Sequence, residues 1–258
     1  MILEGKAAVV TGGGRGIGAS VAELLVREGA RVVVSARSTD EIESVAENLG
    51  GAENQVWAIP CDVTDPEQVA ALYRAALERL GQVDILVNNA GIADSAPLKS
   101  ITLESWNRIM AVNATGTFLC TQTFLPAMVE RGWGRVVNIA SIAGKIGGRY
   151  MAAYVASKHA ALGFTRAVAA EVATTGVTVN AVCPGFVDTP MTDQSVARIV
   201  EKTGAEAANV KEGLERMSPQ NRLMGPEEVA FQVLNLCDPR ARGVNGQGLV
   251  LDGGAVQS

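Results

Sequence analysis

Short apolar runs alternate with longer amphipathic stretches along almost the whole chain, and this alternation constrains the fold more than any other feature. The runs are continuously apolar, as is typical of strands that helices cover on both faces. A repeated order of strand, helix and strand predicts an α/β fold with a doubly wound parallel sheet of about seven strands. The runs lie at residues 7–10, 31–36, 55–63, 84–90, 135–141, 177–185 and 248–254.

The stretches between these runs carry residues that favour the start of a helix, among them Thr39, Asp65 and Thr102. No linker or low-complexity segment divides the 258 residues, so we expect a single domain over residues 1–258. The segment 188–220 is polar and lacks a clean apolar stripe. We expect it to form a helical lid over a substrate site; the alternative is an ordinary surface excursion.

Composition argues against several functional classes. The formal net charge is −5 and the Lys and Arg residues are scattered, so we expect no nucleic-acid partner. No apolar segment reaches the ~18 residues that a membrane span requires. The opening residues, MILEGKAAVV, lead directly into a strand-like run, so we expect no signal peptide and a cytoplasmic location.

Cysteine and histidine content also narrows the chemistry. Four cysteines stand far apart without CxxC spacing, so we expect reduced, buried thiols and no metal site. His159 is the only histidine, and we expect it to be a partly exposed helical residue. A Ser-His-Asp hydrolase would have to use His159, and the G-x-S-x-G motif of the α/β hydrolases is absent.

A glycine-rich segment, VVTGGGRGIGAS at residues 9–20, links the first expected strand to the first expected helix. Gly12, Gly16 and Gly18 permit a tight turn and a close approach of the backbone to a pyrophosphate, and the helix N-terminus offers free N–H groups. The Gly-Lys-Ser/Thr ending of a Walker A loop is absent. We therefore predict a Rossmann-like dinucleotide site, with a purely structural glycine turn as the alternative.

The end of the second expected strand bears on which dinucleotide binds. An acidic residue there binds the ribose 2′-hydroxyl of NAD, whereas an arginine binds the 2′-phosphate of NADP. This strand is followed by Arg37 and Ser38, and Arg15 in the glycine turn supplies a second positive charge. We expect NADP(H). The alternative is NAD(H), with Arg37 in solvent and Asp40 reaching back to the ribose.

Tyr154 and Lys158 stand four residues apart in the segment YVASK, so on a helix they share one face. The ordinary pKa of a tyrosine is ~10, and a neighbouring cation lowers it by favouring the phenolate. We expect Lys158 to lower the pKa of Tyr154, which then transfers a proton near neutral pH. Ser141 ends an expected strand, where α/β sheets place their ligands, and can hydrogen-bond a substrate oxygen.

Six motifs in one order carry a resemblance to a known family. They are TGGGRGIG (11–18), NNAG (88–91), Asn113 in VNATG, Ser141, YVASK and PGFVDTPM (184–191). Together they resemble the classical short-chain dehydrogenase/reductases over residues 3–254, closest to the 3-oxoacyl-thioester reductases and the polyketide ketoreductases. The resemblance implies an NADP-preferring oxidoreductase that moves a hydride between the nicotinamide and a ketone or secondary alcohol, and a homotetramer.

The resemblance also implies roles for single residues. The catalytic tetrad would be Asn113, Ser141, Tyr154 and Lys158. Tyr154 would transfer the proton, Ser141 would orient the carbonyl oxygen, Lys158 would lower the tyrosine pKa and bind the nicotinamide ribose, and Asn113 would hold a water. The implied cofactor-binding residues are Gly12, Gly14, Arg15, Gly16, Ile17, Gly18, Arg37, Ser38, Asp62, Val63, Asn89, Ala90, Gly91, Tyr154, Lys158, Pro184, Gly185, Val187 and Thr189.

The identity of the substrate stays open at the level of sequence. Reductases of this family that act on acyl carrier proteins commonly have a basic residue where this chain has Thr175. Arg131 and Arg135 are the remaining candidates to meet an anionic carrier or a CoA phosphate; the alternative is that both are solvated surface charges. The expected substrate walls hold Ile92, Ile142, Ile146, Tyr150, Met151, Phe186 and Met191.

This apolar set suits either a 3-oxoacyl thioester or a small alicyclic or aromatic ketone. A protein of another class, a nucleotide sensor on the same fold, would keep the glycine turn without needing the tetrad. The direction of the reaction in the cell depends on the ratio of the two cofactor forms.

Overall fold

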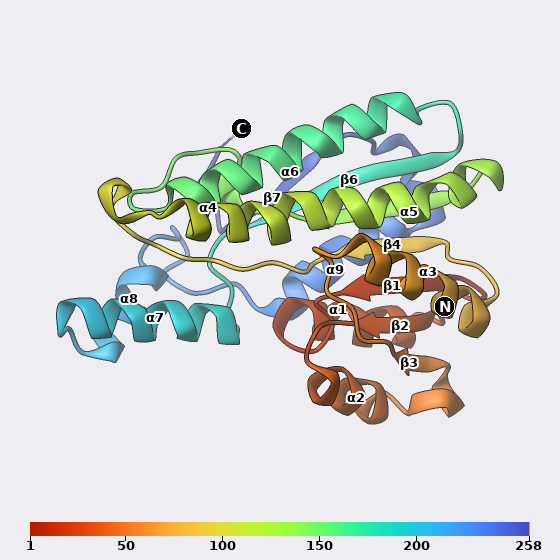
Figure 1. The fold of residues 1–258 in the computed structure, drawn as a ribbon, viewed down its shortest axis with the longest axis horizontal. Coiled ribbons are helices and arrows are strands. Elements are labelled where there is room, and N and C mark those ends of the chain that lie inside the picture. Colours follow the sequence, from red (N-terminus) through yellow and green to blue (C-terminus); the bar gives the residue numbers. More distant parts are fainter. Residues whose placement is uncertain (258) are drawn as a thin grey trace.

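The computed structural model describes residues 1–257, and its centre is a seven-stranded parallel sheet (Figure 1). The strand order is β3-β2-β1-β4-β5-β6-β7. This architecture confirms the α/β doubly wound sheet expected from the alternating runs. The strands are β1 (Ala7–Thr11), β2 (Arg31–Ser35), β3 (Val56–Ala58), β4 (Ile85–Asn88), β5 (Gly134–Ile139), β6 (Val177–Pro184) and β7 (Gly248–Leu251).

Helices cover both faces of the sheet, which explains why its strands are apolar on both sides. One buried cluster joins the sheet to α1 (Gly16–Arg27), α2 (Thr39–Asn48) and α9 (Pro226–Cys237). A second cluster joins the opposite face to α3 (Pro66–Leu80), α5 (Gly116–Glu130) and α6 (Ala152–Glu171). The remaining α-helices are α4 (Leu103–Met110), which packs on α6, and the pair α7 (Pro190–Thr203) and α8 (Ala207–Glu215).

The α7–α8 pair projects to one side of the sheet, at the left of Figure 1. It lies within the segment 188–220 that the sequence singled out, and it is helical as expected. A bridge between Val187 and Met224 joins the two ends of this excursion. The excursion is therefore attached to the body of the fold where it leaves β6 and where it returns toward α9.

The strand expected over 55–63 is much shorter than the apolar run, and β3 covers only Val56–Ala58. Single backbone bonds continue the pairing beyond it, from the Ile59 N–H to Val34 and from the Cys61 N–H to Ala36, each 3.0 Å. Pro60 lies between them, and because alternate residues of a parallel strand donate to the neighbour, its missing N–H faces the free edge of the sheet, where proline is tolerated.

The strand order reverses between β1 and β4, and doubly wound sheets bind ligands in the crevice at such a point. Gly12, directly after β1, has φ +63°, a left-handed conformation that favours glycine. A Cβ on Gly12 would lie 2.9 Å from the Cα of Ala90, which stands two residues beyond the end of β4. The Asn89 amide binds the backbone oxygens of Thr11 and Gly12 at 3.1 and 2.9 Å, which joins the two loops.

Three further expectations concern groups away from this crevice. The four cysteines are free and buried, as expected. His159 is exposed on α6, and its ring nitrogen Nδ1 lies 3.0 Å from the Val155 oxygen. Within residues 1–257, no helix combines the length and apolarity needed to cross a bilayer.

Candidate active site

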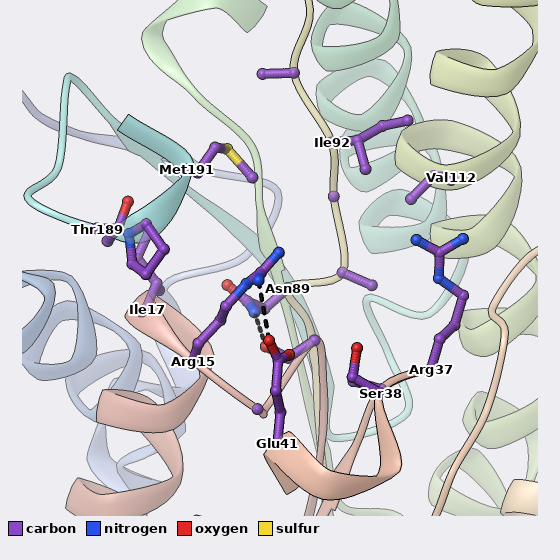
Figure 2. A pocket seen from close by; sticks show the side chains of 18 of the residues that line it. Arg15, Ile17, Arg37, Ser38, Glu41, Asn89, Ile92, Val112, Thr189 and Met191 are labelled. Atoms are coloured by element: carbon purple, nitrogen blue, oxygen red, sulfur yellow. Dashed lines mark hydrogen bonds and ion pairs between the residues drawn. The ribbon is translucent and has the colours of Figure 1, made fainter. Parts of the chain in front are cut away.

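The first cavity, about 340 Å³, lies over the glycine turn that follows β1 (Figure 2). This volume is of the size that proteins use for small ligands and cofactors. Most of the cofactor-binding residues expected from sequence line it: Gly12, Gly14, Arg15, Gly16, Ile17, Arg37, Ser38, Asp62, Val63, Asn89, Ala90, Gly91 and Thr189.

The N-terminus of α1 faces this cavity with its first-turn N–H groups free of side-chain caps. Arg15 is the N-cap residue with extended backbone, its side chain makes no cap, and no acidic residue stands in the first turn. These features favour an anion such as a pyrophosphate. Gly18 does not line the cavity; a Cβ there would lie 2.2 Å from the Gly12 oxygen, so Gly18 serves the packing of the turn.

Charged side chains meet at the end of the cavity next to α2. The Arg15 guanidinium binds the Glu41 carboxylate at 3.0 Å, and Arg37 lies 3.9 Å from Asp62. Figure 2 shows Arg15, Ser38 and Glu41 together on this side of the cavity. Asp40, the acid that the NAD(H) alternative required, is exposed and does not line the cavity. The acid of α2 that reaches this cavity is Glu41, which sequence reasoning missed.

A second cavity of about 200 Å³ adjoins the first and shares several of its walls, among them Asn89, Gly91 and Thr189. Ser141, Tyr154 and Lys158 line it together. The expected residues Pro184, Gly185 and Val187 also line it. The structure thus brings three of the four proposed catalytic residues to one cavity beside the glycine turn.

Tyr154 and Lys158 lie on one face of α6, one turn apart, as their spacing predicted. The Lys158 ammonium donates a hydrogen bond to the Ile139 carbonyl oxygen at 2.8 Å, at the end of β5. Burial lowers the pKa of Lys158 to about 8, because an ammonium loses its hydration there. Lys158 therefore changes its protonation near neutral pH.

The expectation that Lys158 lowers the pKa of Tyr154 is not met in this structure. Withdrawal of the phenol from solvent raises the pKa of Tyr154, and the hydrogen bond with Ser141 acts in the opposite direction. The Lys158 nitrogen lies 5.7 Å from the centre of the Tyr154 ring and is hydrogen-bonded to backbone instead. Tyr154 is accordingly a protonated phenol at neutral pH, able to donate.

Ser141 stands two residues beyond the end of β5 and is the N-cap residue of a short 3₁₀ turn. Its hydroxyl oxygen accepts a bond from the Ala143 N–H at 3.1 Å, which holds the side chain at the cavity wall. The position agrees with the expectation that the end of this strand contributes a polar group to the ligand site.

Asn113 lies in a π-helical segment, Ala111–Thr115, that links α4 to α5. Its side chain exchanges two hydrogen bonds with the backbone of Ile92, at 2.8 and 2.9 Å, and donates a third to the Ser157 hydroxyl at 3.0 Å. Asn113 is 2 % exposed and lines neither cavity. Both N–H groups of its amide are bonded within the protein.

The walls of the second cavity are mostly the apolar residues expected from sequence. Tyr150 is the exception, because it has φ +66° and its side chain is exposed outside both cavities. Sequence reasoning did not name Thr192, Ser195 and Met217, which complete the wall from the α7–α8 side. The expected wall residues found here are Ile92, Ile142, Ile146, Met151, Phe186 and Met191.

Arg131 and Arg135 line neither cavity, contrary to the expectation that they are candidates to meet an anionic carrier or a CoA phosphate, and Arg135 is not the solvated surface charge of the alternative either. Arg135 is 2 % exposed, and its guanidinium binds the oxygens of Gly134 and Gly176 at 2.8 and 3.3 Å. Arg131 donates to the Val83 oxygen. Both arginines lie at the amino end of β5, whereas the two cavities lie beyond the carboxyl ends of the strands.

Two basic side chains of α7, Arg198 and Lys202, form hydrogen bonds with the loop after β4. Arg198 donates to the Ala93 oxygen at 2.8 Å and to the Asp94 carboxylate at 3.2 Å. Lys202 donates to the Ser95 oxygen at 2.9 Å. These contacts join α7 to a wall of both cavities, since Ala93 lines each of them.

Comparison with known proteins decides the family. The sequence profile described as "short chain dehydrogenase" matches residues 6–199. The chain belongs to the short chain dehydrogenase family. The match begins just before β1 and ends within α7. It includes the YVASK segment of α6 and the residues that line the two cavities, apart from Met217.

Individual relatives of this short chain dehydrogenase match over nearly their whole length. A D-beta-hydroxybutyrate dehydrogenase of Rhizobium meliloti is 36% identical over 96% of this chain and 98% of its own. A 3-oxoacyl-[acyl-carrier-protein] reductase of Vibrio cholerae is 39% identical over 98% of each chain. The solved structure of a single-substitution variant of the actinorhodin polyketide ketoreductase with NADPH superposes with a TM-score of 0.93, at 39% identity over 97% of each chain.

Proposed function

We propose that this protein reduces a ketone to a secondary alcohol with NADPH, and catalyses the reverse oxidation when the cofactor ratio favours it. The observation that carries the proposal is the junction of two cavities: one over a glycine turn and helix N-terminus, the other lined by Ser141, Tyr154 and Lys158. A hydride donor bound in the first cavity would reach a carbonyl held in the second.

The residues around the first cavity fit a dinucleotide. The tight glycine turn leaves no room for side chains at Gly12 and Gly18, and the uncapped start of α1 favours a pyrophosphate. Arg15, Arg37 and Ser38 supply donors for a 2′-phosphate. The bound cofactor supplies the hydride, and the protein supplies position and polarity.

Within the second cavity, Tyr154 donates its proton to the carbonyl oxygen during reduction and recovers it during oxidation. Ser141 donates a hydrogen bond to the same oxygen and so orients the substrate. Lys158 binds the nicotinamide ribose and, as an ammonium with a pKa about 8, replaces the proton that Tyr154 has given away. The raised pKa of Tyr154 supports this order, because it keeps the phenol protonated before the reaction.

Asn113 acts as a positioning residue in this scheme. Its amide ties the Ile92 backbone to Ser157, which stands beside Lys158 on α6. A proton-relay water at this place would have to donate to an oxygen of Asn113, because both N–H groups of the side chain are already bonded. The role expected from the family, the holding of such a water, therefore stays a proposal.

The leading substrate class is a 3-oxoacyl thioester or a polyketide ketone. Apart from Lys158, no cationic side chain among residues 1–257 lines the second cavity, and its walls are mostly apolar. A free acid such as hydroxybutyrate, named for the Rhizobium meliloti relative, would need a partner for its carboxylate there. The names of the Vibrio cholerae relative and of the ketoreductase structure favour the neutral ketone. A small alicyclic or aromatic ketone is the second candidate, favoured by the same apolar walls.

Four broader proposals accompany this function. Residues 1–258 act as a single catalytic domain, and residues 188–220 act as its lid, which the contacts of Arg198 with Ala93 and Asp94 support. The enzyme works as a homotetramer, as the family resemblance implies, and in the cytoplasm, where free, buried thiols like those of its four cysteines are typical. Light scattering of the purified protein tests the tetramer directly.

The test is a substrate panel with both cofactors. Purified protein is mixed with NADPH or NADH and with a 3-oxoacyl thioester, the corresponding free 3-oxo acid, a cyclic ketone and an aryl ketone. We expect turnover with the thioester and NADPH to exceed turnover of the free acid at least ~10-fold. No oxidation of either cofactor with any ketone, together with no binding of nucleotide in calorimetry, contradicts the proposal; binding without turnover favours a nucleotide sensor.

A further inference from the structure

An ion pair crosses the end of the first cavity, between two different elements. Arg15 is the N-cap residue of α1, and Glu41 stands in the first turn of α2. Their side chains meet at 3.0 Å between Nη1 and Oε1, and both line the cavity (Figure 2). This contact is a feature of the folded chain, since the two residues are 26 positions apart.

The Glu41 side chain lies directly against the glycine turn. A Cβ built on Gly14 would stand 2.9 Å from the Cβ of Glu41 and 3.3 Å from its carboxylate oxygen Oε2. The side chains of Arg15 and Glu41 are 54% and 37% exposed, so water reaches the pair. Exposed pairs of this kind contribute little to stability, so their separation costs little free energy.

Two of the arginines that line the cavity, Arg15 and Arg37, differ in how closely a carboxylate approaches them. Arg15 is hydrogen-bonded to Glu41 at 3.0 Å, whereas Arg37 and Asp62 approach only to 3.9 Å, beyond hydrogen-bond distance. A phosphate entering here therefore finds Arg37 available and Arg15 already engaged. It also brings negative charge close to the Glu41 carboxylate.

We propose that Glu41 is a specificity-determining residue that weakens the preference for NADPH over NADH, because its carboxylate competes with the 2′-phosphate for Arg15. The inference rests on the proposed function, in which this end of the cavity binds the adenosine ribose. NADPH must draw Arg15 away from Glu41 to gain its second cationic contact. NADH carries no 2′-phosphate and leaves the pair intact.

The experiment measures binding, not turnover. Dissociation constants of NADPH and NADH are determined by calorimetry for the unchanged protein and for Glu41→Gln, which keeps the shape of the side chain and removes its charge. We expect NADPH to bind about three- to fivefold more tightly to Glu41→Gln, the gain that release of one exposed ion pair allows. The NADH constant should change by less than about 1.5-fold.

Two further variants identify the cause. Glu43→Gln removes the same charge from an exposed position of α2 outside the cavity, and it should leave both constants unchanged. In an Arg15→Gln background, Glu41→Gln should no longer tighten NADPH, because the competition for Arg15 is already absent.

Each outcome decides a separate point. An unchanged ratio of the two constants in Glu41→Gln overturns the inference while NADPH binding still supports the proposed function. A full gain in the Arg15→Gln background, or an equal gain in Glu43→Gln, also overturns it, because general charge repulsion would then be the cause. Absence of binding by either nucleotide to the unchanged protein contradicts the proposed function itself.

Discussion

The ammonium nitrogen of Lys158 lies 5.7 Å from the centre of the Tyr154 ring and donates its hydrogen bond to the Ile139 carbonyl oxygen. The two side chains share a helix face, yet burial shifts their pKa values in opposite directions, up for the phenol and down for the ammonium. Both shifts favour the neutral form. In the proposed reaction, the pair therefore begins reduction as a protonated phenol beside a lysine with a pKa of about 8.

The lowered pKa of Lys158 predicts a pH-dependent stability. Between the folded value of about 8 and the ordinary value of 10.5, the unfolded chain binds a proton that the folded chain does not, so the free energy of unfolding rises with pH in that window. A Lys158→Met variant lacks this contribution. We expect the stability of the unchanged protein, relative to the variant, to increase by about 2 kcal/mol from pH 7.5 to 9.5 in urea unfolding.

Comparing the two proteins at each pH cancels the titration of every other group. Stability curves that run parallel over this window would show that Lys158 keeps its ordinary pKa. A relative stability that falls as the pH rises would reverse the sign and contradict the burial argument.

The hydrogen bonds of Ser157 connect α6 to the loop at Ile92, so we expect a change at Ser157 to alter the stability of that loop. The Ser157 hydroxyl accepts from the Asn113 amide at 3.0 Å and donates to the Tyr154 backbone oxygen at 2.7 Å. Ser157→Ala leaves a buried Asn113 N–H without a partner, so we expect a loss of about 1–3 kcal/mol of stability. Hydrogen exchange at the Ile92 amide, which Asn113 also binds, should become faster.

Ser44→Ala is the matched control, because Ser44 is an exposed residue of α2. It should change stability by less than about 0.5 kcal/mol. Equal stability losses in the two variants, or an Ile92 amide whose exchange does not respond to Ser157→Ala, would argue against the coupling.

We expect Arg37 to contribute the larger part of the preference for NADPH over NADH, because no carboxylate in the described part of the chain lies within hydrogen-bond distance of its guanidinium. Arg37→Ala should weaken NADPH binding about 10-fold or more and leave NADH binding nearly unchanged. Fluorescence titration with each nucleotide measures both constants. Arg27→Ala, an exposed arginine of α1 paired with Glu23, is the control. A parallel loss for NADPH and NADH would place Arg37 away from the 2′-phosphate.

We expect the contacts of Arg198 to hold α7 against the loop after β4, which lines both cavities. Arg198→Ala removes the bonds to Ala93 and Asp94, so we expect faster hydrogen exchange over 190–203 and a KM for the ketone about 3–10-fold higher. Arg216→Ala is the control, because Arg216 pairs with Glu212 within the same excursion and lines neither cavity. Unchanged exchange and KM in Arg198→Ala would remove the support for a lid.

Much of the fold could be predicted because its signals are local. Asp65 and Thr102 were expected at helix starts, and both side chains accept bonds from first-turn N–H groups. Thr39 was placed one residue late, because Ser38 is the N-cap of α2. The length of β3 was overestimated, since an apolar run does not show where the regular strand ends and only single backbone bonds continue.

The site could be predicted in outline but not in its charges. Motif positions placed Ser141, Tyr154 and Lys158 at one cavity, because parallel strands and their following helices meet at one edge of the sheet. The Glu41 contact with Arg15 joins residues 26 positions apart and left no local pattern. Burial also decided the Tyr154 pKa, and i, i+4 spacing alone does not report burial.

The central claim is that Tyr154 gives its proton to the carbonyl, and Tyr154→Phe tests it most directly. Single-turnover reduction of a 3-oxoacyl thioester by NADPH is followed for the unchanged protein, for Tyr154→Phe, and for Tyr150→Phe, an exposed tyrosine that lines neither cavity. We predict that Tyr154→Phe slows the reduction by about 10²–10⁴-fold with NADPH binding retained, while Tyr150→Phe keeps its rate. A Tyr154→Phe enzyme that reduces the ketone at the unchanged rate would contradict the account.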